Sequence, residues 1–441
     1  MELALPGRVE VTSRRFLAIA LPATLAQMTT PLLGLVATGA IGRLGDAVLL
    51  GAVAVGALLF DFVFWIFGSL RMGTAGLTAQ ALGRGETVEL RAVLIRALLI
   101  SAAIGIALIL VHLPLAHVAF LAMGASAGVH EAAALYFSVR ILSAPFAIGN
   151  FAVLGWLVGI ARTDIGLGLQ ILIAGVNAAA TALLVLYWDF GIAGAAAANV
   201  LAEFVGMLFG FGAALRLLGR DWHVPWRTVL DRARLIETVA VNSDIMIRTG
   251  LLMLVLVFFT AQGARQDDVT LAANAVLYNM VMVSAFFLDG FATAAEQICG
   301  QSIGAQDRPG FRRAVRMVLF WGFGFAAPAS LLLLFGGGGL IDLLSANPEV
   351  RLVGREFLPL AAATPLLGVA AFAYDGIYSG STWARDMRNL MVPAVLLFFL
   401  AWWLTLPLGN TGLWLAYLSF MAGRGIFLAL RLPALERRTF A

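Results

Sequence analysis

The chain has 441 residues, of which 61% are hydrophobic and only 12% are charged, and its mean hydropathy is +0.94. This composition excludes an ordinary soluble domain, in which about 25% of the residues are charged. The formal net charge is +4, all 29 basic residues are arginine, and Cys299 is the only cysteine, which excludes an internal disulfide and a multi-cysteine metal site.

Apolar runs of about 20 residues recur along nearly the whole chain, and each can cross about 30 Å of hydrocarbon as an α-helix. We therefore predict an all-α integral membrane protein with twelve transmembrane helices. The predicted spans are residues 16–40, 48–71, 93–113, 134–158, 165–187, 191–214, 239–262, 270–293, 314–336, 353–378, 390–408 and 411–430. The first run is too long for the core of a signal peptide, so we expect it to be retained.

Most arginines lie in the two terminal segments and in the even-numbered loops. Because cytoplasmic loops carry the excess of basic residues, we expect both termini in the cytoplasm and the protein in a bacterial inner (plasma) membrane. The high arginine content is then explained by topology and by contact with the lipid bilayer, and no nucleic-acid partner is expected. We expect a monomer.

The chain contains an internal repeat with an offset of 221 residues. This offset pairs Gln80 with Gln301, Gly155 with Gly376, Gly159 with Gly380 and Gly191 with Gly412. The predicted organisation is an N-terminal six-helix lobe (1–217), a cytoplasmic linker (218–238) and a C-terminal six-helix lobe (239–441). Six helices per repeat predict two parallel repeats with a cavity between them, which is a transporter plan, although a duplicated channel or scaffold has the same symmetry.

Acidic residues occur inside the apolar runs of the C-terminal lobe. Asp289 and Glu296 are seven residues apart, so they share one helix face. At the offset of 221, Asp289, Glu296 and Asp375 correspond to Gly68, Ala75 and Leu154. Because the other lobe has no acid there, these acids are predicted to serve binding, of substrate or of an ion, and not folding. For Glu296, a solvated or arginine-paired helix end is the alternative.

Two further features of the C-terminal lobe fit either binding or structure. Asp244 and Arg248 are four residues apart, so they form either a structural ion pair or part of the substrate site. Tyr374 belongs to an aromatic set around the acids that suits lipophilic cations, with ordinary helix packing as the alternative. The other members of this set are Phe286, Phe287, Phe291, Phe372 and Tyr378.

The sequence holds no motif of nucleotide binding, zinc hydrolysis or serine catalysis, so we predict no enzyme activity, no cofactor and no metal site. Energy for transport would then come from an ion gradient. Buried carboxyl groups can exchange protons near neutral pH, so H⁺ is the expected coupling ion, and Na⁺ is also compatible with carboxylate and carbonyl oxygens.

Several motifs together resemble the DinF branch of the multidrug and toxic compound extrusion (MATE) transporters over residues 10–432. They include "LRMGTAGLTAQALG", "NSDIMIRTGLL", "LDGFATAAEQICGQSIGA" and "DGIYSGSTWARDMRNLM". The resemblance implies a V-shaped pair of six-helix bundles that exports small amphipathic, usually cationic, compounds in antiport with H⁺ or Na⁺ by alternating access. It also implies that Asp375 takes part in cation coupling or substrate binding, and that Pro22 is a hinge.

The sequence departs from this family in the N-terminal lobe. Ala37 in "GLVAT" stands where the branch usually has an aspartate, and Thr181 stands where a second acid is expected. The remaining polar residues of a predicted N-lobe cavity are Asn150, Asn177, Asn199 and Glu203, of which only Glu203 can titrate. Coupling therefore runs through the C-terminal acids, which we prefer, or through Glu203, or is weak.

Two other functions stay open. One is a flippase-like exporter of a lipid or polysaccharide, which would need arginines for phosphate, whereas the predicted cavity residues are mainly acidic. The other is a weakly coupled or non-transporting membrane protein.

Overall fold

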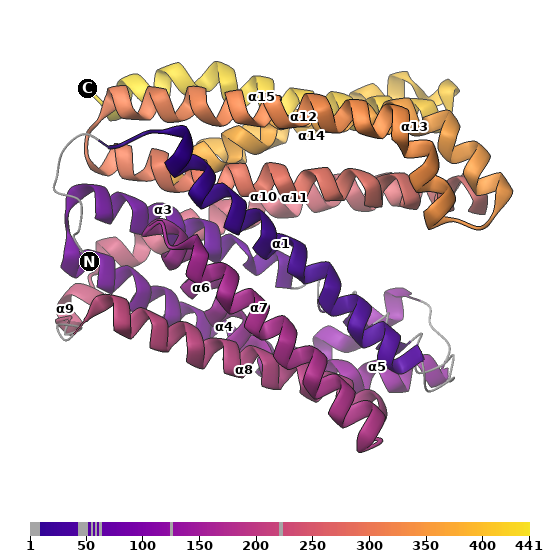
Figure 1. Ribbon diagram of the computed structural model, residues 1–441, viewed down its shortest axis with the longest axis horizontal. Coiled ribbons are helices and arrows are strands. Elements are labelled where there is room, and N and C mark those ends of the chain that lie inside the picture. Colours follow the sequence, from indigo (N-terminus) through magenta and orange to yellow (C-terminus); the bar gives the residue numbers. More distant parts are fainter. Residues whose placement is uncertain are drawn as a thin grey trace. The chain divides into compact units, whose positions relative to one another are not determined.

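The computed structural model describes residues 9–42, 52–53, 56–57, 60, 64–123, 127–219 and 224–441. These residues form helices joined by short turns, and no strand occurs among them (Figure 1). Ten of the described helical segments are long and apolar enough to cross a membrane. The prediction of an all-α membrane protein is therefore confirmed, while most of the predicted span at 48–71 lies outside the described residues.

The chain divides into two compact units with a boundary between Val239 and Ala240. The first unit contains Leu25–Val239, and the second contains Ala240–Ala441 together with Leu5–Thr24. The helix α1 (Ser13–Gly42) therefore begins in the second unit and ends in the first.

The first unit is built mainly from helices of the N-terminal repeat. They are α3 (Ser69–Arg84), α4 (Thr87–Met123), α5 (Ala127–Arg140), η1 (Ile141–Ser143), α6 (Ala144–Gly159), α7 (Thr163–Thr181), η2 (Ala182–Tyr187), α8 (Gly191–Leu218) and α9 (Trp226–Val229). Figure 1 shows α7 and α8 packed side by side. Large apolar side chains fill the interior, among them Tyr136, Phe137 and Trp156.

The second unit is built mainly from the C-terminal repeat. Its helices are α10 (Arg232–Ala264), α11 (Asp268–Gly304), α12 (Arg308–Leu344), α13 (Pro348–Gly380), α14 (Ala384–Leu404), η3 (Leu406–Leu408) and α15 (Asn410–Thr439). Helix α13 packs against α11, α12 and α15 (Figure 1). Trp414, Tyr417 and Phe398 lie in its apolar core.

Two pairs of glycines at the offset of 221 make the same helix contact in both units. A Cβ atom on Gly155 (α6) would overlap the carbonyl oxygen of Arg71 (α3), and a Cβ atom on Gly376 (α13) would overlap that of Ala292 (α11). One turn later, Gly159 and Gly380 lie just as close to the carbonyl oxygens of residues 75 and 296. Small residues let membrane helices approach to backbone contact, so these glycines fix the α3–α6 and α11–α13 crossings.

Each repeat also gives its N-terminal segment to the other unit. Residues 226–239 are the counterparts of residues 5–18 at this offset, and they lie in the first unit. The buried Arg96 holds them there, because its guanidinium donates to the carbonyl oxygens of Thr228 (3.3 Å) and Val229 (3.0 Å). In the second unit, the backbone N–H of Val9 donates to the Asp307 carboxylate (2.8 Å).

Candidate functional site

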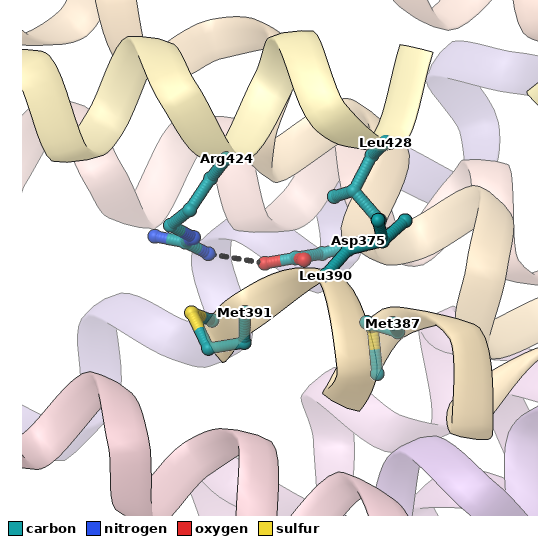
Figure 2. Close-up of a pocket in the computed structure, with 6 residues that line it drawn as sticks. All are labelled: Asp375, Met387, Leu390, Met391, Arg424 and Leu428. Atoms are coloured by element: carbon teal, nitrogen blue, oxygen red, sulfur yellow. Dashed lines mark hydrogen bonds and ion pairs between the residues drawn. The ribbon is translucent and has the colours of Figure 1, made fainter. Parts of the chain in front are cut away.

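Asp375, on α13, lies between two buried arginines of the second unit. Its Oδ2 atom accepts hydrogen bonds from Nη2 of Arg248 on α10 and from Nη2 of Arg424 on α15, the latter at 2.6 Å. The three side chains are only 5%, 6% and 2% exposed, in that order. Figure 2 shows the Arg424 guanidinium pointing at the Asp375 carboxylate. The carboxylate predicted to attract cations is thus already compensated by two positive charges.

The predicted ion pair between Asp244 and Arg248 is wrong. Asp244 instead pairs with Arg388 of α14 at 2.5 Å, while Arg248 turns to Asp375. Residues 244 and 248 do lie on one face of α10, but the more deeply buried guanidinium needs the more deeply buried acid, because a buried charge without a counter-charge is costly.

A small pocket lies beside this cluster. Asp375, Arg424, Met387, Leu390, Met391 and Leu428 line it, and they come from α13, α14 and α15 (Figure 2). Its empty volume is ≈ 170 Å³, but it is too narrow to hold a water-sized sphere. One wall is therefore charged, the rest is made of flexible apolar side chains, and the pocket is closed in this conformation.

The other predicted acids of the second unit lie along α11. Asp289 is half-buried and acts electrostatically on Arg248, so it lies near the Asp375 cluster. Glu296 is only 2% exposed, so the alternative of a solvated helix end is wrong for its side chain. Its backbone carbonyl abuts Gly380 at the α11–α13 crossing. Tyr374, the residue before Asp375, is also buried.

Several of the predicted aromatic residues take part in helix packing. The Phe287 ring stacks on Phe325 of α12 at 4.7 Å between centroids, and Phe291 meets the same ring at 5.7 Å. The Tyr378 hydroxyl donates to the carbonyl oxygen of Leu428 (2.7 Å). These contacts give the alternative, ordinary packing, for these three side chains.

In the first unit, Glu203 on α8 is held by Asn150 on α6. The Asn150 amide donates to the Glu203 carboxylate (2.7 Å) and to the Glu203 backbone carbonyl (3.0 Å). Arg140, whose guanidinium lies 3.9 Å from the centroid of the Phe60 ring, acts on Glu203 electrostatically. Glu203 thus combines a neutral amide partner with a more distant positive charge.

The remaining predicted residues of the first unit are spread over α7 and α8. Asn177 and Thr181 are buried on one face of α7, and their side-chain polar atoms have no hydrogen-bond partner among the described residues. Asn199 donates to the carbonyl oxygen of Ala195 one turn earlier (2.9 Å), so it is occupied within its own helix.

Pro22 lies inside α1, two residues before the chain passes from the second unit to the first. The backbone of Ala37 belongs to the same helix, but its side chain lies outside the described residues.

Sequence reasoning assigned Arg424 a structural role and did not connect it with Asp375. The available signal was an arginine in the middle of a long apolar run, because such a residue needs a buried partner. Met387 and Met391 carried no comparable signal, since methionine is common in packed cores.

Comparison with known proteins places this geometry in a family. The family model described as MatE matches residues 22–183 and again residues 245–406. The chain is 36% identical over 418 residues to the DNA damage-inducible protein F of Escherichia coli strain K12, covering 93% of this chain and 90% of that protein. It is 25% identical over 429 residues to the probable multidrug resistance protein NorM of Rhizobium meliloti strain 1021, covering 91% and 89%.

The fold matches solved structures as well. A crystal structure of a MATE protein in its bent conformation superposes with a TM-score of 0.87 at 17% identity and covers 97% of each chain. The two matches of the family model follow the two repeats, and MATE proteins are membrane transporters and not enzymes. The chain therefore belongs to the MATE family, as its resemblance to the DinF branch predicted.

Proposed function

We propose that this protein is a secondary active efflux transporter that exports small amphipathic compounds, lipophilic cations among them, in antiport with H⁺ by alternating access. The observation that carries the proposal is a buried carboxylate on a membrane-spanning helix of each unit, Glu203 in the first and Asp375 in the second. Intramembrane acids are costly, so a transporter family with two of them gives each a task in binding or coupling.

Glu203 is the better candidate for the coupling proton. Its hydrogen-bond partner is a neutral amide, so a proton on Glu203 removes a buried negative charge and leaves the amide bonded. A proton on Asp375 would leave Arg248 and Arg424 without their shared counter-charge, which a buried ion pair does not tolerate well. We therefore assign coupling to Glu203 in place of the aspartate that the family usually carries at position 37.

The test is transport of a lipophilic fluorescent cation in proteoliposomes, driven by an imposed ΔpH or by an imposed Na⁺ gradient. We expect the wild type to respond to ΔpH and Glu203→Gln to fall to the level of protein-free liposomes, because glutamine keeps a polar partner for Asn150 but cannot release a proton. Glu237→Gln, an exposed acid paired with Arg234 at 3.3 Å, is the matched control.

Three results would revise the proposal. Wild-type protein that moves no cation under either gradient would contradict antiport. A Glu203→Gln variant that still responds to ΔpH, together with an inactive Asp289→Asn, would move coupling to the second unit. A response to the Na⁺ gradient alone would replace H⁺ by Na⁺.

Location and partners follow the same proposal. We propose a monomer in a bacterial inner membrane with both termini in the cytoplasm, as the arginine distribution indicates. Labelling of single introduced cysteines at the two termini with a membrane-impermeant reagent, in whole cells and in inverted vesicles of a Cys299→Ala background, tests the orientation.

A further inference from the structure

The Asp375 cluster carries more positive than negative buried charge. Two guanidinium groups, Arg248 and Arg424, share one carboxylate oxygen, and all three side chains lie away from solvent. Asp289 adds a negative charge near Arg248, but it is only half-buried. Arg424 has no second acid among the printed ion pairs of the described residues, and its Nη1 atom faces the sulfur of Met421 at 3.6 Å. The cluster can therefore accept one further anionic group.

The hydrogen bonds of the cluster are incomplete. Within the described residues, the Nε atoms of Arg248 and Arg424 and the Oδ1 atom of Asp375 are buried without a hydrogen-bond partner. Buried polar atoms nearly always find partners, and a guanidinium group is built to donate in parallel pairs to a carboxylate. Two arginines that meet a single oxygen leave much of this donor capacity unused.

The adjoining pocket shows what kind of body such a ligand would have. Met387, Leu390, Met391 and Leu428 surround the charged wall, and the methionines have flexible side chains that adapt to different shapes. A ligand that places an anionic group on the arginines would therefore place an apolar body among these residues (Figure 2). The narrow pocket must widen to admit it.

We propose that Arg248 and Arg424 bind the carboxylate group of an amphipathic substrate, and that Asp375 occupies the two guanidinium groups when no substrate is bound. This proposal rests on the proposed efflux function and extends its substrates from lipophilic cations to amphipathic carboxylates. The substrate carboxylate competes with Asp375 for the guanidinium donors, and its apolar chain takes up the methionine-lined space.

A binding measurement on the purified full-length protein in a neutral detergent tests this directly. The probes are dansyl-labelled undecanoic acid and its methyl ester, which differ only in the carboxylate. We expect the acid to bind about tenfold more tightly than the ester, since a hydrogen bond to a charged group contributes about 1.5–3 kcal/mol. Equal affinities of the acid and the ester would overturn the proposal.

Variants locate the preference. Arg424→Gln and Arg248→Gln are expected to lower the affinity for the acid to that for the ester without changing the ester. Asp375→Asn is expected to raise the affinity for the acid, because it removes the competing charge. Arg388→Gln removes an arginine of the same unit that pairs with Asp244, and it should leave both affinities unchanged. An acid preference that survives in both cluster arginine variants would overturn the assignment, and the wild-type comparison stands even if a variant does not fold.

A phospholipid headgroup is the other source of an anionic group. The same titration in nanodiscs of phosphatidylcholine and of phosphatidylglycerol separates the two. An acid preference in both lipids supports a substrate carboxylate, whereas a preference lost only in phosphatidylglycerol assigns the arginines to lipid and overturns the proposal. Since these measurements need no gradient, failure of coupled transport and failure of this site give different results.

Discussion

The two units share a backbone contact and differ in their buried charges. The glycines at 155 and 376 make the same helix crossing, as do those at 159 and 380. Yet Glu203 and Arg424, which are equivalent at the offset of 221, carry opposite charges, and Asp375 has Leu154 as its counterpart. The comparison shows that the helix packing is common to the repeats, while each unit carries its own polar groups.

The charged residues can therefore be tested apart from the fold. If the repeat determines packing and the charges determine binding, changes at shared glycines should act alike in both units, and changes at the charged positions should not.

The largest effect is expected from giving the second unit the residue of the first at one position. Asp375→Leu copies Leu154 but leaves Arg248 and Arg424 buried without their acid, which should lower the free energy of unfolding by about 3–5 kcal/mol. Chemical unfolding in detergent measures it. Replacing both arginines by methionine in the same variant should recover most of the loss, and an unaltered stability of Asp375→Leu would contradict the compensation described here.

The glycine contacts should respond equally in the two units. Gly155→Ala and Gly376→Ala each force a Cβ atom into a carbonyl oxygen of the facing helix, and each should cost about 1–3 kcal/mol. Gly168→Ala and Gly324→Ala are the controls, one per unit, because no atom lies within 4 Å of a Cβ placed there. Thermal melting of the four variants compares them. A loss confined to one unit would show that the repeats do not pack alike.

The smallest effect concerns a pair of equivalent acids at helix starts. Asp307 caps α12 by accepting from the backbone N–H of Gly310 (2.9 Å), and it also holds Val9. Its counterpart Glu86 pairs with Arg84 at the surface. Asp307→Ala should cost about 1–2 kcal/mol, whereas Glu86→Ala should change stability by about 0.5 kcal/mol or less. Similar losses in the two variants would remove this difference between the units.

The fold was predictable because its determinants are local. Apolar runs of membrane length specify the helices, so the predicted span at 191–214 falls within α8 and that at 353–378 within α13. The repeated glycines were visible as a fixed offset. The candidate acids were also visible, because a charge inside an apolar run is conspicuous.

The partners of those acids were not predictable from spacing. Arg248 is four residues from Asp244 but binds Asp375, 127 positions away, because a long guanidinium side chain reaches whichever helix the tertiary packing places beside it. The expectation of a mainly acidic cavity failed for the same reason in the second unit, since Arg424 and Arg248 come from α15 and α10 to meet one acid of α13.

The exchange of N-terminal segments has a consequence for dividing the polypeptide. Residues 5–24 complete the second unit, and residues 226–239 complete the first, which is the arrangement of a domain-swapped dimer fused into one chain. Cut after Val239, the C-terminal fragment would lose the segment that places Phe16 against Phe291 and Val9 on Asp307. The two fragments would then depend on co-expression for complementation, and neither half of the gene encodes a self-sufficient folding unit.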